Sequence, residues 1–362
     1  MRARRVASLV SAGVIIGAAF LGTAGPVAAD DDDDDDDRRG RVQVLLRDLS
    51  SPKGIAINSK DSVVIGQGAF GPPAPAFEYF FKGPHRGTST PLTEPVNLID
   101  VAVTPDGAGW GIGGDRVLYR QSPDGSIVAI LDIVAYQAGD PDPYNVTDDP
   151  GEANPYGLTA LKSNDVLVAD AANNDVIRVS PDGSAWTVAR WTSRLVKTDR
   201  VGDPTLPSKL PAEGVPTSIA IGRDGYAYVG QLVGFPGRPG SAHIWRVNPN
   251  AEDAVCSVGK KTHDCKSWKS GFTAIVDLAF NPKNGTLYVY QIAKRGWLAF
   301  EEGFVTGTFP PAVLLEVRRG HKPRELVKGK LREPGGVVVT RDGRIFVTDG
   351  MFSNGRLVRV RT

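Results

Sequence analysis

Oxygen-bearing side chains recur in this sequence where short apolar runs begin or end. Asp100 lies in LIDVAV, Asn154 precedes PYGLTAL, Asp277 lies in VDLAF, and Asp349 ends IFVTD. Carboxylate and amide oxygens are the ligands that Ca²⁺ takes in proteins. If these runs are strands that converge on one axis, their polar residues would form a ring able to hold a metal ion or a polar ligand.

The same pattern places ten polar side chains at one end of the predicted strands, and these are our candidate binding residues. A structural role is the alternative, because backbone groups around the axis of a ring need hydrogen-bond partners and ordered water. The identity of a metal stays open. The ten residues are Gln67, Asp100, Asn154, Tyr156, Asp170, Gln231, Asp277, Gln291, Glu333 and Asp349.

No catalytic residues are predicted. The sequence has four histidines, His85, His243, His263 and His321, and none falls where the polar ring is expected. A Ser-His-Asp arrangement therefore lacks its base. The sequence also contains neither a G-x-S-x-G elbow nor an HExxH motif.

The elements that would position these residues are six copies of one sequence repeat. Each copy is an apolar run, a polar corner and a second apolar run, as in NPYGLTAL-KSND-VLVAD-AANN-DVIRVSPDG at 154–183. Repeats of this kind predict short antiparallel strands, and their number predicts a β-propeller. The other copies begin near Ser51, Leu98, Val215, Thr273 and Glu333.

We therefore predict an all-β fold, a six-bladed β-propeller of four-stranded blades. FEYFF and TSTPL would be the outer strands of the first and least regular blade. The sixth copy has three strands before Thr362, and VQVLL at 42–46 could supply the fourth. Pairing of the N-terminal strand with the last blade would close the ring and protect its edges.

The repeats resemble NHL-type propeller repeats. More closely, NPYGLTAL…LVADAANNDVIRVSPDG, VPTSIAIGRDGYAYVGQLVGFP and GFTAIVDLAFNPKNGTLYVYQIA resemble the ScyD/ScyE family of exported bacterial proteins, and the resemblance covers residues 41–362. It implies a propeller fold and export. It carries over no catalytic residues, because the family has no agreed set.

Strands alternate in direction within a blade, so loops after second strands and connections between blades emerge on the same face. We call it the loop-rich face, because nearly all the long segments fall on it. Long ordered loops commonly carry binding residues. These segments are 68–76, 132–153, 191–214, 232–242 and 292–311.

The loop-rich face should also be rich in aromatic side chains. They could stack on sugars, aromatic metabolites or a partner protein. Equally, they could pack the long loops down onto the disc. The residues are Phe70, Tyr136, Tyr144, Phe235, Trp297, Phe300, Phe304 and Phe309.

Residues 1–29 are typical of a signal peptide, with a basic start, an apolar segment and a cleavage site after Ala29. An uncleaved membrane anchor is the alternative, although the apolar segment is short for a bilayer span. The export route, Sec or Tat, stays open.

Residues 30–40 contain eight consecutive aspartates and predict a solvated, disordered tail, with weak Ca²⁺ binding as the alternative. Residues 41–362 would be a single propeller domain outside the cytoplasm.

Cys256 and Cys265 are predicted to form a local disulfide, as expected of an exported chain. A zinc site with His263 is the alternative, but the cysteine spacing matches no zinc pattern. The segment 248–266 should lie opposite the loop-rich face, remote from any site.

The formal net charge of the chain is +1, and loss of the three arginines of 1–29 changes it to −2. This charge excludes a basic surface of the kind that binds nucleic acid.

Two functions fit these observations. The first is a non-catalytic binding or scaffold protein, a monomer without a cofactor or a transmembrane segment in its mature form, which binds a protein, glycan or small molecule on the loop-rich face. The second is a metal-dependent (Ca²⁺ or Zn²⁺) lactonase or esterase-like hydrolase, similar to the six-bladed gluconolactonases, whose metal polarises an ester carbonyl. Asp100, Asn154 and Asp277 match part of that metal site, whereas SPKG at 51–54 has no acidic residue at the expected place.

Overall fold

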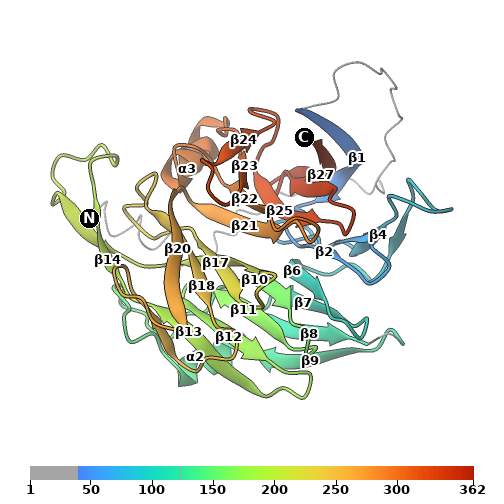
Figure 1. Cartoon of the computed structure of the whole chain (residues 1–362), viewed down its shortest axis with the longest axis horizontal. Helices are drawn as coiled ribbons and strands as arrows, with labels where there is room; N and C mark the ends of the chain where they lie inside the picture. The colour runs from blue at the N-terminus through green and yellow to red at the C-terminus, as the bar shows by residue number, and fades with distance from the viewer. Residues whose placement is uncertain (1–39, 123) are drawn as a thin grey trace.

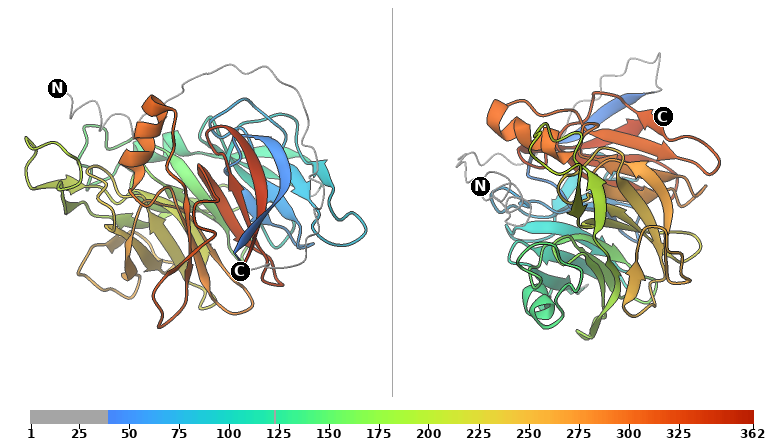
Figure 2. Two further views of the ribbon diagram at one scale, coloured as in Figure 1. Left: turned by 90° about the horizontal axis from the view of Figure 1, so that it is seen from above. Right: turned by 90° about the vertical axis from the view of Figure 1, so that its left-hand side faces the viewer.

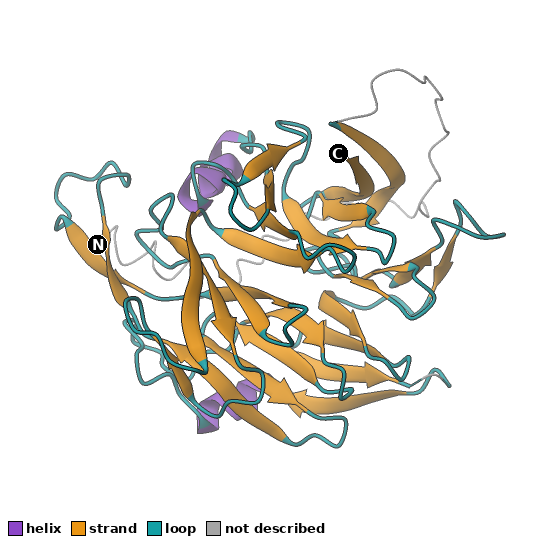
Figure 3. Ribbon diagram, in the orientation of Figure 1, coloured by secondary structure: helices purple, strands orange, loops and turns teal. Residues whose placement is uncertain are grey.

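The chain folds into a ring of six four-stranded antiparallel units, which are the blades of a β-propeller (Figure 1; Figure 3). The structure, a computed structural model, describes residues 40–122 and 124–362. The predicted fold class is confirmed. The predicted signal peptide and the aspartate run at 30–37 lie outside the described residues.

Each blade corresponds to one copy of the sequence repeat, and its strands follow one another outward from the axis. Blade 1 contains β2 (Ile55–Ile57), β3 (Val63–Ile65), β4 (Phe77–Tyr79) and β5 (Ser89–Pro91). Blade 2 contains β6 (Leu98–Val103), β7 (Gly109–Gly113), β8 (Val117–Gln121) and β9 (Ile127–Asp132). Blade 3 contains β10 (Pro155–Ala160), β11 (Val166–Asp170), β12 (Asp175–Val179) and β13 (Ala185–Trp191). Blade 4 contains β16 (Pro216–Ile221), β17 (Ala227–Gln231), β18 (Ala242–Val247) and β20 (Cys265–Phe272). Blade 5 contains β21 (Ile275–Phe280), β22 (Leu287–Gln291), β23 (Val313–Val317) and β24 (Arg324–Leu326). Blade 6 contains β25 (Pro334–Val339), β26 (Ile345–Asp349), β27 (Asn354–Arg361) and β1 (Arg41–Ser50).

The N-terminal strand closes the ring, as the sequence predicts. β1 pairs with β27 in antiparallel fashion, with Val44 opposite Val358. Figure 2 shows the blue N-terminal strand along the red C-terminal one. Leu46 and Leu49 of β1 are fully buried in the cluster that joins blade 6 to blade 1. β1 therefore supplies the fourth and outermost strand of the last blade.

Apolar residues pack the blades against one another, and the polar corners turn the chain between strands. In the corner TPDG, Asp106 Oδ1 accepts hydrogen bonds from Thr104 Oγ1 at 2.6 Å and from Ala108 N at 3.1 Å, and Gly107 has φ +87°. This is the local geometry that Asp-Gly turns favour. Between blades 3 and 4, Trp191 meets Trp245 edge to face at 6.3 Å between ring centroids.

The long connections, which we predicted to be loops, contain two helices and a hairpin. Helix α2 (Ile133–Gly139) begins where Asp132 accepts a hydrogen bond from Ala135 N, and α3 (Trp297–Thr306) ends at Gly307 in the left-handed conformation. A hairpin, β14 (Arg194–Lys197) with β15 (Lys209–Ala212), occupies the connection from blade 3 to blade 4. The helices, purple in Figure 3, lie outside the six blades.

The predicted disulfide between Cys256 and Cys265 is present, with a Cα–Cα distance of 5.4 Å. Its segment, which we predicted to lie remote from any site, contains a strand. β19 (Ala254–Cys256) adds to the outer edge of blade 3 and runs parallel to β13. Thr192 N donates to Cys256 O at 3.2 Å, so the disulfide segment reaches the base of the β14–β15 hairpin. None of the helices in the described part of the chain is long and apolar enough to cross a membrane.

Candidate functional site

A lysine lies among the polar side chains at the axis of the ring. Lys53, just before β2, has its Nζ 3.5 Å from Asp100 Oδ2, and it donates to Tyr156 O at 2.5 Å. The ammonium also lies 4.1 Å from the centroid of the Tyr156 ring. The Lys53 side chain is 4% exposed and that of Asp100 is 13% exposed. This buried cation belongs to none of our ten candidates.

Two aspartates tie neighbouring blades together at this level. Asp100 Oδ2 on blade 2 accepts from Leu158 N on blade 3 at 2.9 Å. Asp277 Oδ2 on blade 5 accepts from Val337 N on blade 6 at 2.6 Å. Each carboxylate also accepts from the backbone N–H of the residue that follows it. Both acids therefore serve the joint between two blades.

Glycines make room for these joints. Gly157 and Gly336 directly precede the two donor residues, Leu158 and Val337. A Cβ on Gly157 would lie 2.6 Å from Thr217 O on blade 4, and one on Gly336 would lie 2.8 Å from Lys53 O. Real Cβ atoms do not approach other atoms so closely, so the inner strands can pack this tightly only with glycine at these positions.

Burial controls the charge of the two acids. Burial, and then the charge of Asp100, raise the pKa of Asp277 from 3.8 to about 7. Burial also raises the pKa of Asp100, and the ammonium of Lys53 opposes that rise. Burial raises the pKa of the Tyr156 phenol as well, with both carboxylates adding to it. Near neutral pH the pair therefore carries less than two negative charges beside one ammonium.

These residues do not fit the metal site that the hydrolase hypothesis requires. Ca²⁺ takes about six to eight oxygen ligands, whereas Asp100 and Asp277 are each engaged by two backbone N–H groups. The ammonium of Lys53 stands beside Asp100, where a cation would have to bind. Across 40–122 and 124–362, no three His, Cys, Asp or Glu side chains converge in an arrangement able to hold a metal.

The other seven candidates bond to the connections or the strands next to their own strands. Asp170 Oδ1 accepts from Asn154 N at 2.8 Å, and Gln291 Oε1 accepts from Thr273 N at 2.9 Å. Gln67 Oε1 does the same with Ser50 N at 2.8 Å. The remaining three bond similarly: Glu333 to Phe352 N, Asp349 to Arg356, and Gln231 to Arg194. These are structural contacts, and the binding role of all ten residues stays a prediction.

Aromatic side chains mostly hold the loops in place. Trp297 is buried and donates from Nε1 to Val233 O at 2.9 Å, which joins α3 to the loop of blade 4. Phe300 and Phe304 of α3 meet Phe352 of blade 6 at 5.5 and 5.4 Å between ring centroids. Phe70 of blade 1 meets Phe352 at 4.9 Å. Phe304 and Phe70 nonetheless stay 50% and 41% exposed, so part of this cluster faces solvent.

The loops of neighbouring blades also contact one another and enclose open pockets. Val146 N in the α2 connection donates to Glu213 Oε1 at 3.1 Å, and Arg238 pairs with Asp199 at 2.7 Å. One pocket, of about 260 Å³, lies between the β14–β15 hairpin and the loop of blade 4, and includes Arg194. Another, of about 510 Å³, lies between α2 and the β13–β19 edge.

The sequence did not lead us to predict a role for either Lys53 or Arg194. A lysine at the start of an innermost strand, in SPKG, was the one available signal.

Solved structures with the same fold are six-bladed β-propeller proteins. A glucose dehydrogenase superposes with a TM-score of 0.54 and 12% identity over 89% of this chain and 99% of that one. A gluconolactonase from Xanthomonas campestris gives 0.52 and 14% over 94% and 99%, and a PQQ-bound aldose sugar dehydrogenase from Streptomyces coelicolor gives 0.50 and 13% over 90% and 99%. At these identities the likeness concerns the fold alone.

No protein-family model matches the sequence. No curated protein matches it either.

Proposed function

We propose that this chain is an exported, non-catalytic β-propeller of the ScyD/ScyE type that binds a protein, glycan or small molecule on its loop-rich face. One observation carries the proposal. The acids at the axis, Asp100 and Asp277, are engaged by backbone N–H groups and by Lys53. The open pocket beside the β14–β15 hairpin and the exposed aromatic rings belong instead to the loops of the same face.

Export is supported by two features. The disulfide Cys256–Cys265 suits an oxidising compartment, where such bonds persist. The sequence of 1–29, with cleavage after Ala29, supplies the route out of the cytoplasm. In this proposal the mature protein is a monomer that works without a cofactor.

A metal-dependent lactonase or esterase-like hydrolase is the second candidate. It is favoured by the fold shared with a gluconolactonase and by the raised pKa of the buried Asp277, since perturbed acids are frequent at active sites. The ammonium of Lys53 beside Asp100 argues against it, because it takes the position that a catalytic metal would need. We therefore rank binding first.

Retention on defined surfaces tests the binding proposal. The mature chain is applied in solution to a glycan array and to surfaces coated with purified bacterial envelope polysaccharides. Phe304→Ser changes an exposed ring of the loop-rich face, and the matched control Ile127→Ser changes an apolar residue at the start of β9, at the opposite end of its blade, which is 56% exposed. We expect retention that Phe304→Ser weakens and Ile127→Ser leaves unchanged. Absence of retention, or equal loss in both variants, would overturn the proposal.

A further inference from the structure

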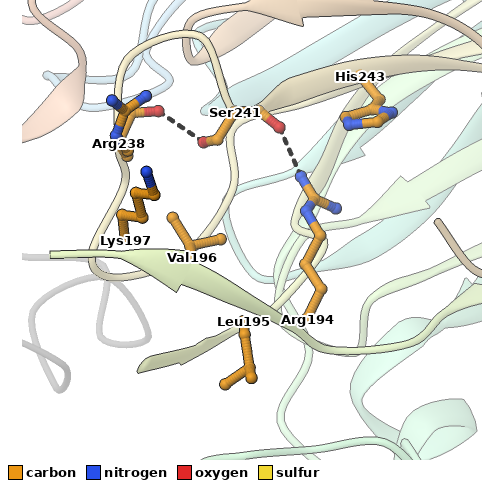
Figure 4. A pocket seen from close by; sticks show the side chains of 7 residues that line it. All are labelled: Arg194, Leu195, Val196, Lys197, Arg238, Ser241 and His243. Carbon is orange, nitrogen blue, oxygen red and sulfur yellow. Dashed lines mark hydrogen bonds between the residues drawn. The ribbon is translucent and has the colours of Figure 1, made fainter. Parts of the chain in front are cut away.

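The pocket beside the β14–β15 hairpin is lined mainly by cationic and hydrogen-bonding side chains. Arg194 and Lys197 come from β14, Arg238 and Ser241 from the loop of blade 4, and His243 from β18 (Figure 4). Its volume of about 260 Å³ suits a small molecule or one charged group of a larger one, rather than a chain segment.

Arg194 is partly buried and has no carboxylate partner among the described residues. Its Nη2 donates to Ser241 O at 2.7 Å (Figure 4). Its Nη1 reaches Gln231 Oε1 at 3.5 Å. Both partners are neutral, and no acidic side chain of 40–122 or 124–362 lies within ion-pair distance of it. Burial accordingly lowers the pKa of Arg194 to about 10, with no acidic group opposing the fall. A buried cation ordinarily has a counter-charge.

The neighbouring side chains add positive charge and hydrogen-bond capacity. Arg238 is balanced by Asp199 at 2.7 Å, and Lys197 is exposed beside them. His243 bonds Ser267 Oγ through Nδ1 at 2.7 Å. Burial and the charge of Arg194 lower the pKa of His243 to about 4, so the ring is neutral at pH 7. The lining thus contains the cations Arg194, Lys197 and Arg238, of which Asp199 pairs with Arg238, and this leaves a net positive pocket.

We propose that this pocket binds a small oxyanion, namely a carboxylate, sulfate or phosphate group, with Arg194 as its anchor. The planar guanidinium offers parallel N–H donors that match such groups, and partial burial strengthens the attraction. Lys197 at the rim adds a second, mobile charge. The inference rests on the proposed binding function and gives its ligand a chemical class.

Calorimetric titration with sodium phosphate, sodium sulfate and sodium acetate tests the proposal, with chloride used to hold the ionic strength constant. We expect at least one oxyanion to saturate the mature chain with a dissociation constant below ~1 mM. Arg194→Gln should weaken it at least tenfold, and Lys197→Gln several-fold. Lys283→Gln, which removes an exposed charge on the opposite face, should bind like the wild type. The three salts show which oxyanion chemistry the pocket selects.

The absence of saturable binding, or binding by Arg194→Gln equal to that of the wild type, would overturn the anion site. If Arg194→Gln does not fold, the exposed Lys197→Gln still decides, since unchanged affinity in that variant also contradicts the proposal. Retention that depends on Phe304 without oxyanion binding would overturn this inference alone. Oxyanion binding that depends on Arg194 without such retention would exclude glycans and envelope polysaccharides as the ligand and keep the anion site.

Discussion

The carboxylate of Asp100 on blade 2 accepts the backbone N–H of Leu158 on blade 3 at 2.9 Å. Three blades further on, Asp277 has the same relationship to Val337, at 2.6 Å. Each donor follows a glycine that leaves no room for a side chain. An acid on one blade and a glycine on the next therefore form a repeated joint at the axis. This joint gives both acids a structural role at the axis.

Gly157→Ala should destabilise the ring. The new Cβ would lie 2.6 Å from Thr217 O, and backbone atoms there have little freedom to move. We expect a loss of about 1–3 kcal/mol in the free energy of unfolding, measured by urea denaturation. Gly109→Ala is the matched control, because its Cβ would have no neighbour nearer than 3.7 Å. Equal effects in the two variants would refute the close-approach argument.

Asp277→Asn should remove a pH dependence of stability. The pKa of Asp277 rises from 3.8 in the unfolded chain to about 7 in the fold, so the folded state holds its proton over that interval. The wild-type free energy of unfolding should therefore fall as pH rises from about 4 to about 7, relative to the variant. Melting curves of both proteins across this range measure the difference.

An exposed acid provides the control for that experiment. Asp148→Asn removes a carboxylate in the solvent-exposed part of the α2 connection. Its melting temperature should follow the wild type at every pH. A constant difference between Asp277→Asn and the wild type from pH 4 to 7 would show that burial does not hold the proton on Asp277.

Ring closure predicts that Leu46→Ala is costly. Leu46 is 1% exposed in β1 and packs between the two ends of the chain. Truncation of a buried leucine costs about 2–5 kcal/mol. Val305→Ala, at a side chain that is 90% exposed, should change stability by less than about 0.5 kcal/mol. A small effect of Leu46→Ala in thermal and urea unfolding would argue that the ring does not depend on β1.

Calcium should not stabilise the folded chain. A ligand that binds only the native state raises the melting temperature, and the oxygens of Asp100 and Asp277 are already engaged. After treatment with a chelator, addition of millimolar Ca²⁺ should leave the melting temperature unchanged. A saturable rise that Asp100→Asn abolishes would restore the metal-site hypothesis.

The fold was predictable because local pattern and topology agree in this sequence. Six alternations of apolar runs and turn residues define the blades, and VQVLL at 42–46 has the pattern of the strand missing from the last blade. Helix α3 was missed, although Gly307 after WLAFEEGFVT is a typical helix end. The long connection invited a loop interpretation because no repeat covers it.

The site was harder to predict because its contacts join segments far apart in the chain. The ten candidates follow from strand ends, yet only tertiary packing brings Lys53 to Asp100 and Tyr156. Arg194 lies in a connection, and its position against Ser241 depends on how the β14–β15 hairpin folds back over blade 4. The aromatic residues supported two interpretations, and burial of Trp297 and exposure of Phe304 show that the loops contain both kinds.

An assay of hydrolysis by the axial acids distinguishes a binding protein from a hydrolase most directly. Wild-type chain and Asp100→Asn are assayed with glucono-δ-lactone and p-nitrophenyl acetate, with and without millimolar Ca²⁺ or Zn²⁺. We predict that neither protein exceeds the buffer rate with either metal, because Lys53 and backbone N–H groups engage the carboxylates. Metal-dependent turnover by the wild type that is lost in Asp100→Asn would contradict this prediction.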